Sequence, residues 1–499
     1  MTLGSSRLRA LCDLDTASAR EVAGRHEYDG RVQDLSLAGV AGALDALGVG
    51  PPCADPHDEA RLRIAEEAAR VRFGELELHR RDPMVHVRNL DLTDYARSYA
   101  PIEQRLAARE EHVRAWPDAV SAAIQALDDV AAPVAAAAIP VAEGLANSLG
   151  PQDERARGAL SRLLSHLHDA AGSGKQDFGM GATGLTRLLA SAEGVDVDLG
   201  QLEERADSER GRLRELLTES CHRIDAKAPV ADTMRVLALD RPEPHELVDE
   251  VRALVGEVIE WTAEHDLVPH HDGLCLVGPT PEAQPFAVAM MIANAPFEPD
   301  GPSWFRIAPP RASWSERQRE DWMAMFSRPG LANIALHEVA PGHYSHGRAM
   351  RRAQGEVRRT LRSETFSEGW AHYVEELALE QGFRDSDPAF AVAVARDGLL
   401  RVTRMACAIG LNTGTMTTAD AVARYESDVF LAGHAAHVAA QRVAMDPTTI
   451  GYTWGKLAIL DVRERAKSLW GKDFSVQRLH RAMLALGSPP LGLLQDVLA

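Results

Sequence analysis

Apolar residues recur at three- and four-residue spacing through most of this 499-residue chain, and this helical period limits its fold more than any other feature. The pattern predicts helices over residues 37–47, 59–78, 102–115, 119–130, 155–171, 185–192, 198–220 and 244–265, with Pro117 separating the third from the fourth. Only residues 274–277 and 304–308 have strand-like composition, and residues 286–293 suit either a helix or a strand. A mainly α fold follows.

Composition excludes several classes of function. The chain has 54 Lys and Arg against 73 Asp and Glu, a net charge of −19, so neither nucleic acid nor an anionic membrane is an expected partner. The five cysteines are scattered and form no CxxC pair, which favours free thiols and a cytoplasmic location. The first residues lack the apolar stretch of a secretion signal, and residues 130–142 are too short for the ~20 residues of a membrane span.

One segment carries the residues of a metal site. It contains His337 and Glu338, followed by Pro341, Gly342 and His343. Two histidines six residues apart point about 240° apart on an ideal helix, so an unbroken helix cannot direct both to one ion. Proline removes a backbone hydrogen bond and glycine tolerates unusual dihedrals, so we expect a break that returns His343 to the face of His337. The alternative is a helix end with two surface histidines.

A second segment offers a third ligand. Glu364, Glu368 and His372 follow one another at four-residue spacing and share one helix face. Glu368 is the expected ligand because Gly369 beside it leaves room for a close helix approach. Glu364 or His372 then supports a ligand imidazole from behind. The other acidic residues of this helix are expected to be solvated, namely Glu375 and Glu376.

These segments carry a resemblance to a known family. HEVAPGH, FSEGWAHYVEE, DPTTIGYTWGKLAILDVRERA and LHRAMLALGSPPLGLL occur in that order from residue 337 onward. This arrangement resembles the bacterial family called domain of unknown function 885, which is similar to mainly helical zinc peptidases of the gluzincin group. The resemblance implies a large helical zinc-peptidase-like fold with a central cleft and a short β edge element. Residues 1–280 would form one side of the cleft, and residues 281–499 would form the catalytic region.

The resemblance also implies roles for individual residues. His337, His343 and Glu368 would bind zinc. Glu338 would act as general base toward a metal-activated water. Tyr452 would stabilise the oxyanion as a phenol donor or protonate the leaving amine.

Other residues have open roles under the same resemblance. Arg463 or His480 would anchor a substrate carboxylate, support the site from behind or act as a structural partner. His346 is a further candidate for supporting a ligand or contacting substrate. The strand at residues 304–308 would be the edge on which a substrate backbone lies.

Two positions depart from the family pattern. Asn412 stands where relatives commonly carry a histidine, and His434 and His437 lie in a segment that is often acidic in relatives. The last two are more often packing residues than ligands. The departures put the substrate in question more than the metal.

Three functions are compatible with these residues. The leading hypothesis is a zinc-dependent hydrolase that cleaves an amide bond in a peptide or peptide-like small molecule. The second is a biosynthetic enzyme that uses the metal as a Lewis acid on a small molecule. The third is a helical binding protein with an inactive site.

Overall fold

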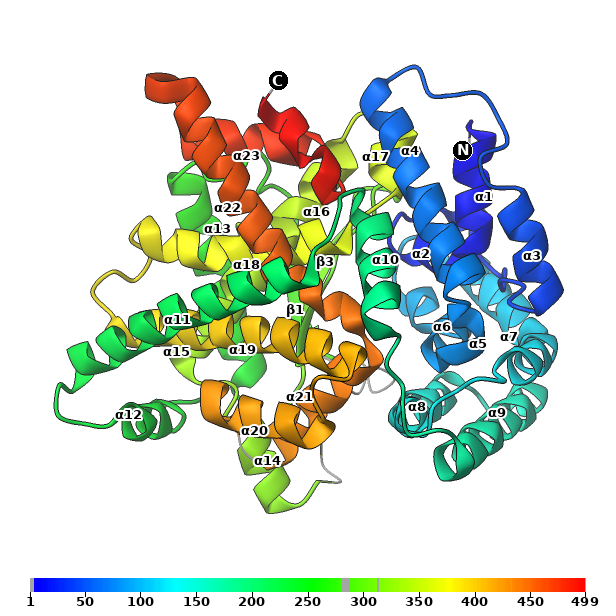
Figure 1. Ribbon diagram of the computed structural model, residues 1–499, viewed down its shortest axis with the longest axis horizontal. Coiled ribbons are helices and arrows are strands. Elements are labelled where there is room, and N and C mark those ends of the chain that lie inside the picture. The colour runs from blue at the N-terminus through cyan, green and yellow to red at the C-terminus, as the bar shows by residue number, and fades with distance from the viewer. Residues whose placement is uncertain (1–3, 281–287, 312–313, 432, 499) are drawn as a thin grey trace.

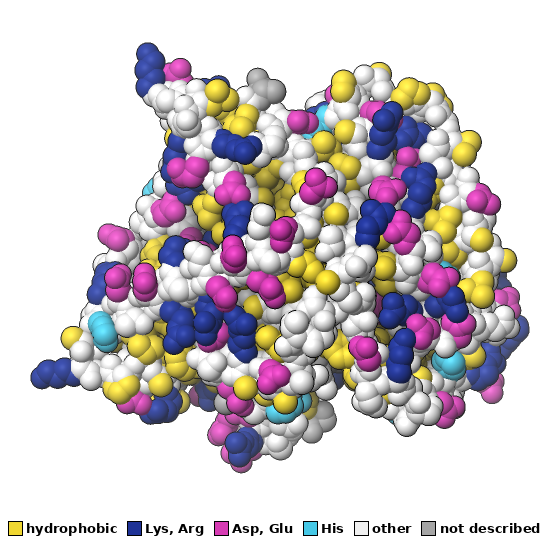
Figure 2. Space-filling model, in the orientation of Figure 1, with side chains coloured by type: hydrophobic (Ala, Val, Ile, Leu, Met, Phe, Trp, Pro, Cys, Tyr) yellow, Lys and Arg dark blue, Asp and Glu magenta, His cyan; other side chains and the backbone are white. Residues whose placement is uncertain are grey.

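A computed structural model describes residues 4–280, 288–311, 314–431 and 433–498. Within these ranges the chain forms 23 α-helices and one small sheet (Figure 1), which confirms the mainly α prediction. None of the helices in these ranges is long and apolar enough to cross a membrane. Basic and acidic side chains alternate over the face shown in Figure 2.

The first part of the chain forms the blue and cyan helices of Figure 1. They are α1 (Ser6–Leu14), α2 (Thr16–Glu21), α3 (Leu37–Asp45), α4 (Pro56–Ala69), α5 (Leu78–Arg81), α6 (Pro83–Asn89), α7 (Ile102–Ala126), α8 (Ala132–Gly144) and α9 (Glu154–Ser173). Two hydrophobic clusters hold them together, one around Leu62 and the other around Trp116.

The predicted break at Pro117 is wrong, because α7 runs without interruption from Ile102 to Ala126. Trp116 and Val120 lie on its buried face and are 0 % exposed. The packing of this face outweighs the hydrogen bond that proline removes. The carbonyl of Pro117 accepts a bond from the Ser121 hydroxyl at 2.7 Å.

One small sheet is formed by a segment in the middle of the chain. It consists of β1 (Cys275–Pro279), β2 (Ala289–Ile292) and β3 (Ser303–Ile307), in the order β1-β3-β2. β3 pairs parallel with β1 and antiparallel with β2. The ambiguous stretch at 286–293 therefore contains a strand, although residues 286 and 287 lie outside the described ranges.

The expectation that the strand at residues 304–308 forms an edge for substrate is wrong. β3 is the central strand, so its backbone groups are already bonded on both sides. Phe305 and Ile307 on its inner face are 0 % exposed. A strand that is apolar on one face and flanked by two partners has no free edge for a peptide.

The remaining helices form the core that carries the site. They are α10 (Gly181–Glu193), α11 (Leu199–Ile224), α12 (Val230–Leu237), α13 (Leu247–Glu264), α14 (Glu316–Met323), α15 (Arg328–Glu338), α16 (His343–Arg352), α17 (Gly355–Thr360), α18 (Glu364–Glu380), α19 (Pro388–Thr413), α20 (Thr418–Val429), α21 (His434–Met445), α22 (Gly451–Trp470) and α23 (Val476–Ala485). α11 packs along α19, and α10 contacts both α4 and α19 (Figure 1). The division at residue 280 stays a prediction.

A close helix crossing lies at the centre of this core. α18 and α22 meet at Gly369 and Gly455, where a Cβ on Gly369 would overlap the backbone of Gly455. The sequence expectation that Gly369 permits a close approach is confirmed. The crossing brings the turn that carries Glu368 next to the first turn of α22, which carries Tyr452.

Candidate metal centre

The chain breaks between the two histidines of the sequence motif. α15 ends at Glu338, and α16 begins at His343. The amide of Gly342 donates to the carbonyl of Leu336 at 3.1 Å, and a Cβ at Gly342 would overlap the carbonyl oxygens of Leu336 and His337. Only glycine fits this close turn. The break is fixed from α18, because the indole of Trp370 donates to the carbonyl of Pro341 at 2.9 Å.

The break brings three side chains together as the sequence predicted. The ring nitrogens of His337 and His343 and a carboxylate oxygen of Glu368 all lie within 4.8 Å of one another. Nε2 of His337 is 3.6 Å from Oε2 of Glu368, and Nε2 of His343 is 3.4 Å from the same atom. Their side chains are 7 %, 12 % and 20 % exposed, so the cluster is shielded but not sealed.

The donor set fits zinc. Zinc prefers nitrogen and oxygen ligands in a tetrahedron, and bonds of about 2.1 Å place two such ligand atoms about 3.4 Å apart. The two separations to Glu368 match that spacing before any ion is placed. Two imidazoles and one carboxylate leave a fourth position open, which is the pattern of catalytic rather than structural sites.

A buried carboxylate orients the first ligand. Nδ1 of His337 lies 2.6 Å from Oε1 of Glu375, which is 0 % exposed. The other carboxylate oxygen of Glu375 accepts from Asn333 at 3.0 Å and from Arg401 at 2.9 Å. The contact leaves Nε2 of His337 as the nitrogen that faces Glu368 and His343.

Charges within the cluster act strongly on one another. Burial alone would raise the pKa of Glu368, but His343 and His337 hold it well below its ordinary value. Burial and Arg401 lower the pKa of His337, yet Glu368 and Glu375 together raise it to about 9. The protein thus concentrates negative charge around an imidazole pair, an arrangement that favours a cation.

Comparison with known proteins identifies the family. A family model described as bacterial protein of unknown function (DUF885) matches residues 90–498. This chain belongs to the DUF885 family. No curated protein matches the DUF885 chain in sequence.

Two solved structures share its fold. One is a protein of unknown function from Shewanella oneidensis, described as a candidate lipoprotein, with 18 % identity, a TM-score of 0.78 and coverage of 98 % of this chain and 97 % of that one. The other is a candidate lipoprotein from Colwellia psychrerythraea, with 17 % identity, a TM-score of 0.78 and coverage of 99 % and 96 %.

Glu375 of this DUF885 protein was not among the residues that sequence reasoning selected, since it was expected to be solvated. One signal was present: Glu368, His372 and Glu375 are spaced by four and three residues, so they share one helix face. Its neighbour Glu376 is not free either, because it contacts Lys456 and lies 2.7 Å from Arg212.

Replacing Glu375 tests this support directly. We expect Glu375→Gln to weaken zinc binding about 10- to 100-fold, because His337 loses the carboxylate that orients it. Competition with a chromogenic chelator measures the affinity. Glu376→Gln is the matched control, since its carboxylate contacts Lys456 and Arg212 instead of a ligand, and its zinc affinity should stay within about twofold. Equal affinities for both variants would contradict the assignment.

Two further predicted residues have functional groups without a described hydrogen-bond partner. Glu338 is 8 % exposed, and its carboxylate has no hydrogen bond or ion pair to any residue that the structure describes. The hydroxyl of Tyr452 likewise has no hydrogen bond within the described ranges. Burial and the charge of Glu368 raise the pKa of Tyr452 to about 12, although nearby arginines act in the opposite direction, so the phenol keeps its proton at neutral pH.

Residues expected to support the ligands fall into two groups. His372 is buried beside the cluster and its Nδ1 lies 3.4 Å from the carbonyl of Tyr452; burial and the nearby charges of Lys456 and Arg401 hold its pKa well below its ordinary value. Glu364 instead has a side chain 59 % exposed and pairs with Arg362 at 3.3 Å. Its described contacts do not include a ligand histidine, because it lies in the exposed first turn of α18.

The remaining candidates make structural contacts. His346 lies 3.2 Å from the carbonyl of Gly487, and burial lowers its pKa to about 3. His480 lies 2.7 Å from the carbonyl of Leu267 and 3.1 Å from the Tyr373 hydroxyl.

Arg463 and Asn412 are also bound to protein groups. Arg463 pairs with Glu380 at 2.6 Å, and the amide of Asn412 donates to the carbonyl of Ala408 at 3.0 Å. None of these contacts involves a metal-ligand candidate.

The two histidines of α21 do not join the cluster. His434 and His437 are exposed, and Nδ1 of His437 lies 2.9 Å from the carbonyl of Gly433. The expectation that they pack in the core is wrong, because the buried face of α21 is formed by Ala436, Ala440 and Val443.

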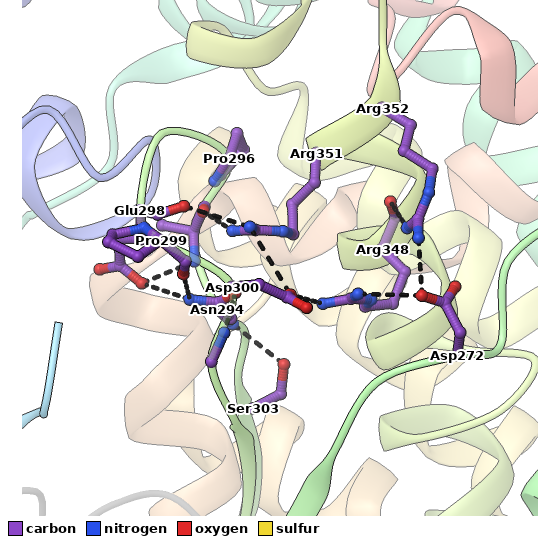
Figure 3. A network of polar contacts seen from close by, with 12 residues as sticks. Asp272, Asn294, Pro296, Glu298, Pro299, Asp300, Ser303, Arg348, Arg351 and Arg352 are labelled. Atoms are coloured by element: carbon purple, nitrogen blue, oxygen red, sulfur yellow. Dashed lines mark hydrogen bonds and ion pairs between the residues drawn. The ribbon is translucent and has the colours of Figure 1, made fainter.

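A polar network fixes the helix that begins with His343 (Figure 3). Arg348 of α16 donates to Asp272, which precedes β1, at 3.1 Å and to Asp300, which lies between β2 and β3, at 3.0 Å. Arg351 donates to the backbone carbonyl of Glu298 at 3.1 Å. These contacts hold α16 against the loops around the sheet, so the position of His343 is set from two sides.

Proposed function

We propose that this protein is a zinc-dependent hydrolase that cleaves an amide bond in a peptide or peptide-like small molecule. The observation that supports it is a set of three donor residues in which the two separations to Glu368 match those of zinc ligands, adjacent in sequence to Glu338, whose carboxylate has no described partner. The similarity of the motif to gluzincin peptidases, inferred from the sequence, belongs to the same proposal.

Each residue of the site has its own role in the proposed reaction. Zinc held by His337, His343 and Glu368 would polarise the scissile carbonyl and activate a water molecule. Glu338 would serve as the proton acceptor for such a water, because its carboxylate has no described hydrogen bond or ion pair. Tyr452 keeps its proton and donates a hydrogen bond to the oxygen on which negative charge develops. Glu375 keeps the imidazole of His337 in the orientation that binding requires.

The two alternative functions have weaker support. The biosynthetic alternative was motivated by Asn412 and the α21 histidines, but Asn412 is bonded within its own helix and the histidines are exposed. The inactive binding protein would have no need for Glu338, whose carboxylate has no described hydrogen bond or ion pair and follows directly after His337. A carboxylate left free next to a candidate metal ligand is better explained by a function that uses it.

Metal content and cleavage test the proposal together. We expect about one zinc per chain by elemental analysis, release of amine from members of a short-peptide library, loss of activity after chelation and recovery with zinc. A protein that binds no metal under any loading condition would contradict the proposal. A zinc-replete protein that leaves every peptide intact would favour the biosynthetic alternative.

The cellular location of the protein is part of the same proposal. The five cysteines are free, three of them buried, which is compatible with a reducing cytoplasm. The two structures of the same fold are described as candidate lipoproteins, which would suit a different location. We propose the cytoplasmic location, which fractionation of the native host cell would test.

A further inference from the structure

Two arginines from different helices lie around the phenol of Tyr452. Arg404 comes from α19, and its ζ-carbon lies 5.3 Å from the centre of the Tyr452 ring. Arg442 comes from α21, which packs against α19, and its side chain is exposed to solvent; Tyr452 raises its pKa, as do Asp446 and Glu368. Both guanidinium groups therefore act on the phenol that the proposed reaction uses.

Neither guanidinium is neutralised by a direct partner. Within the described ranges, no hydrogen bond or ion pair joins the side chain of Arg404 or Arg442 to an acidic residue. Their neighbour Arg401 is different, since it pairs with Glu375 at 2.7 Å. Asp446 is the nearby acid for Arg442, but its carboxylate accepts from the amide of Thr448 at 3.0 Å.

The positive charges repel one another. Burial lowers the pKa of Arg404, and the charges of Arg442 and Arg401 lower it further. Arg442 is exposed and Arg404 is half-buried, so solvent screens both charges and an anionic ligand can reach them. Arg463 differs, because it pairs with Glu380 at 2.6 Å.

A buried hydroxyl in the same place also lacks a partner. Tyr425 of α20 is 0 % exposed, and its hydroxyl has no hydrogen-bond partner within the described part of the chain. Burial raises its pKa, while Arg404 and Arg442 lower it, so both guanidiniums act on this hydroxyl. The two guanidinium groups and the two phenols therefore offer hydrogen-bond donors that have no described acceptor.

We infer that Arg404 and Arg442 bind a carboxylate of the substrate, with the hydroxyl of Tyr425 nearby, while the phenol of Tyr452 between this subsite and the metal cluster donates to the oxyanion. The planar guanidinium pairs with a carboxylate through two parallel hydrogen bonds, so these residues select a substrate with a free carboxylate near the scissile amide. The C-terminal carboxylate of a short peptide meets this requirement. The inference rests on the proposed hydrolase function and moves carboxylate recognition from Arg463 or His480 to these two arginines.

A matched pair of probes tests this selectivity by binding. One is a dipeptide analogue with a zinc-chelating hydroxamate and a free C-terminal carboxylate, and the other is its C-terminal carboxamide. Calorimetry on the zinc-loaded full chain should show the acid binding about tenfold or more tighter than the amide. In the double variant Arg404→Gln and Arg442→Gln, this ratio should fall to about twofold or less.

Controls separate this role from a structural one. Arg463→Gln should leave the acid-to-amide ratio at the wild-type value, because Arg463 pairs with Glu380. Arg404→Gln should leave the unfolding midpoint unchanged or raise it, because like-charge repulsion is relieved. An acid preference that survives in the double variant overturns the inference.

The outcomes also distinguish this inference from the proposed function. Equal binding of the acid and the amide by wild-type protein overturns the inference and leaves the hydrolase proposal standing. A chain that takes up no zinc, and so binds neither hydroxamate, overturns both.

Discussion

Glu338→Gln is expected to lower kcat/KM for peptide hydrolysis by about 10²- to 10⁴-fold while zinc content stays at the wild-type value. The amide has nearly the shape of the carboxylate but cannot accept the proton of the attacking water. Glu338 is not one of the three grouped ligands, so the metal should remain. Its side chain has no described ion pair to lose, so the unfolding midpoint should also remain. Steady-state kinetics and elemental analysis of the same preparation measure both quantities.

The matched control is another Glu to Gln change close by. Glu364→Gln removes an exposed carboxylate one helical turn before Glu368, and it should leave both kcat/KM and zinc content unchanged. If Glu338→Gln retained wild-type activity, the general base would have to be another group. If it lost zinc together with activity, the separation of roles between Glu338 and the three ligands would be wrong.

The local part of the site could be predicted from the sequence. The six-residue spacing of His337 and His343 excludes a continuous helix, and Pro341 with Gly342 supplies the break between them. Gly369 next to Glu368 predicts a close helix crossing, which the contact with Gly455 bears out. The break and the crossing could be predicted because each depends on a few neighbouring residues.

The failures have a common physical cause, which is packing from distant parts of the chain. Pro117 does not end α7, because the buried stripe that includes Trp116 outweighs one lost hydrogen bond. β3 is not an edge, because the chain before it supplies partners on both sides. Glu375 is not solvated, because Arg401 and Asn333 approach it from other helices. No local pattern contains those contacts.

The proposed carboxylate subsite also could not be predicted from local sequence patterns. Arg404, Tyr425, Arg442 and Tyr452 come from four different helices, and arginine is common throughout this chain. Their spacing in sequence gives no reason to group them. What distinguishes Arg404 from Arg463 is the absence of a described acidic partner, and that is a property of the folded chain.

Gly342→Ala should have the second large effect, because it acts on the backbone that brings the two histidines together. The added Cβ would overlap the carbonyl oxygens of Leu336 and His337, and backbone cannot move aside as a flexible side chain can. We expect a loss of about 2–4 kcal/mol in the free energy of unfolding and a zinc affinity at least about tenfold weaker. Urea unfolding and chelator competition measure the two effects.

Gly256→Ala is the control for the general effect of replacing a helical or near-helical glycine by alanine. Gly256 lies inside α13, and a Cβ there meets no atom within 4 Å. Alanine should therefore stabilise that helix by about 0.4–1 kcal/mol and leave zinc affinity unchanged. Wild-type zinc affinity in Gly342→Ala would mean that His343 reaches the ligand cluster without the close turn, and that the break between α15 and α16 does not depend on glycine.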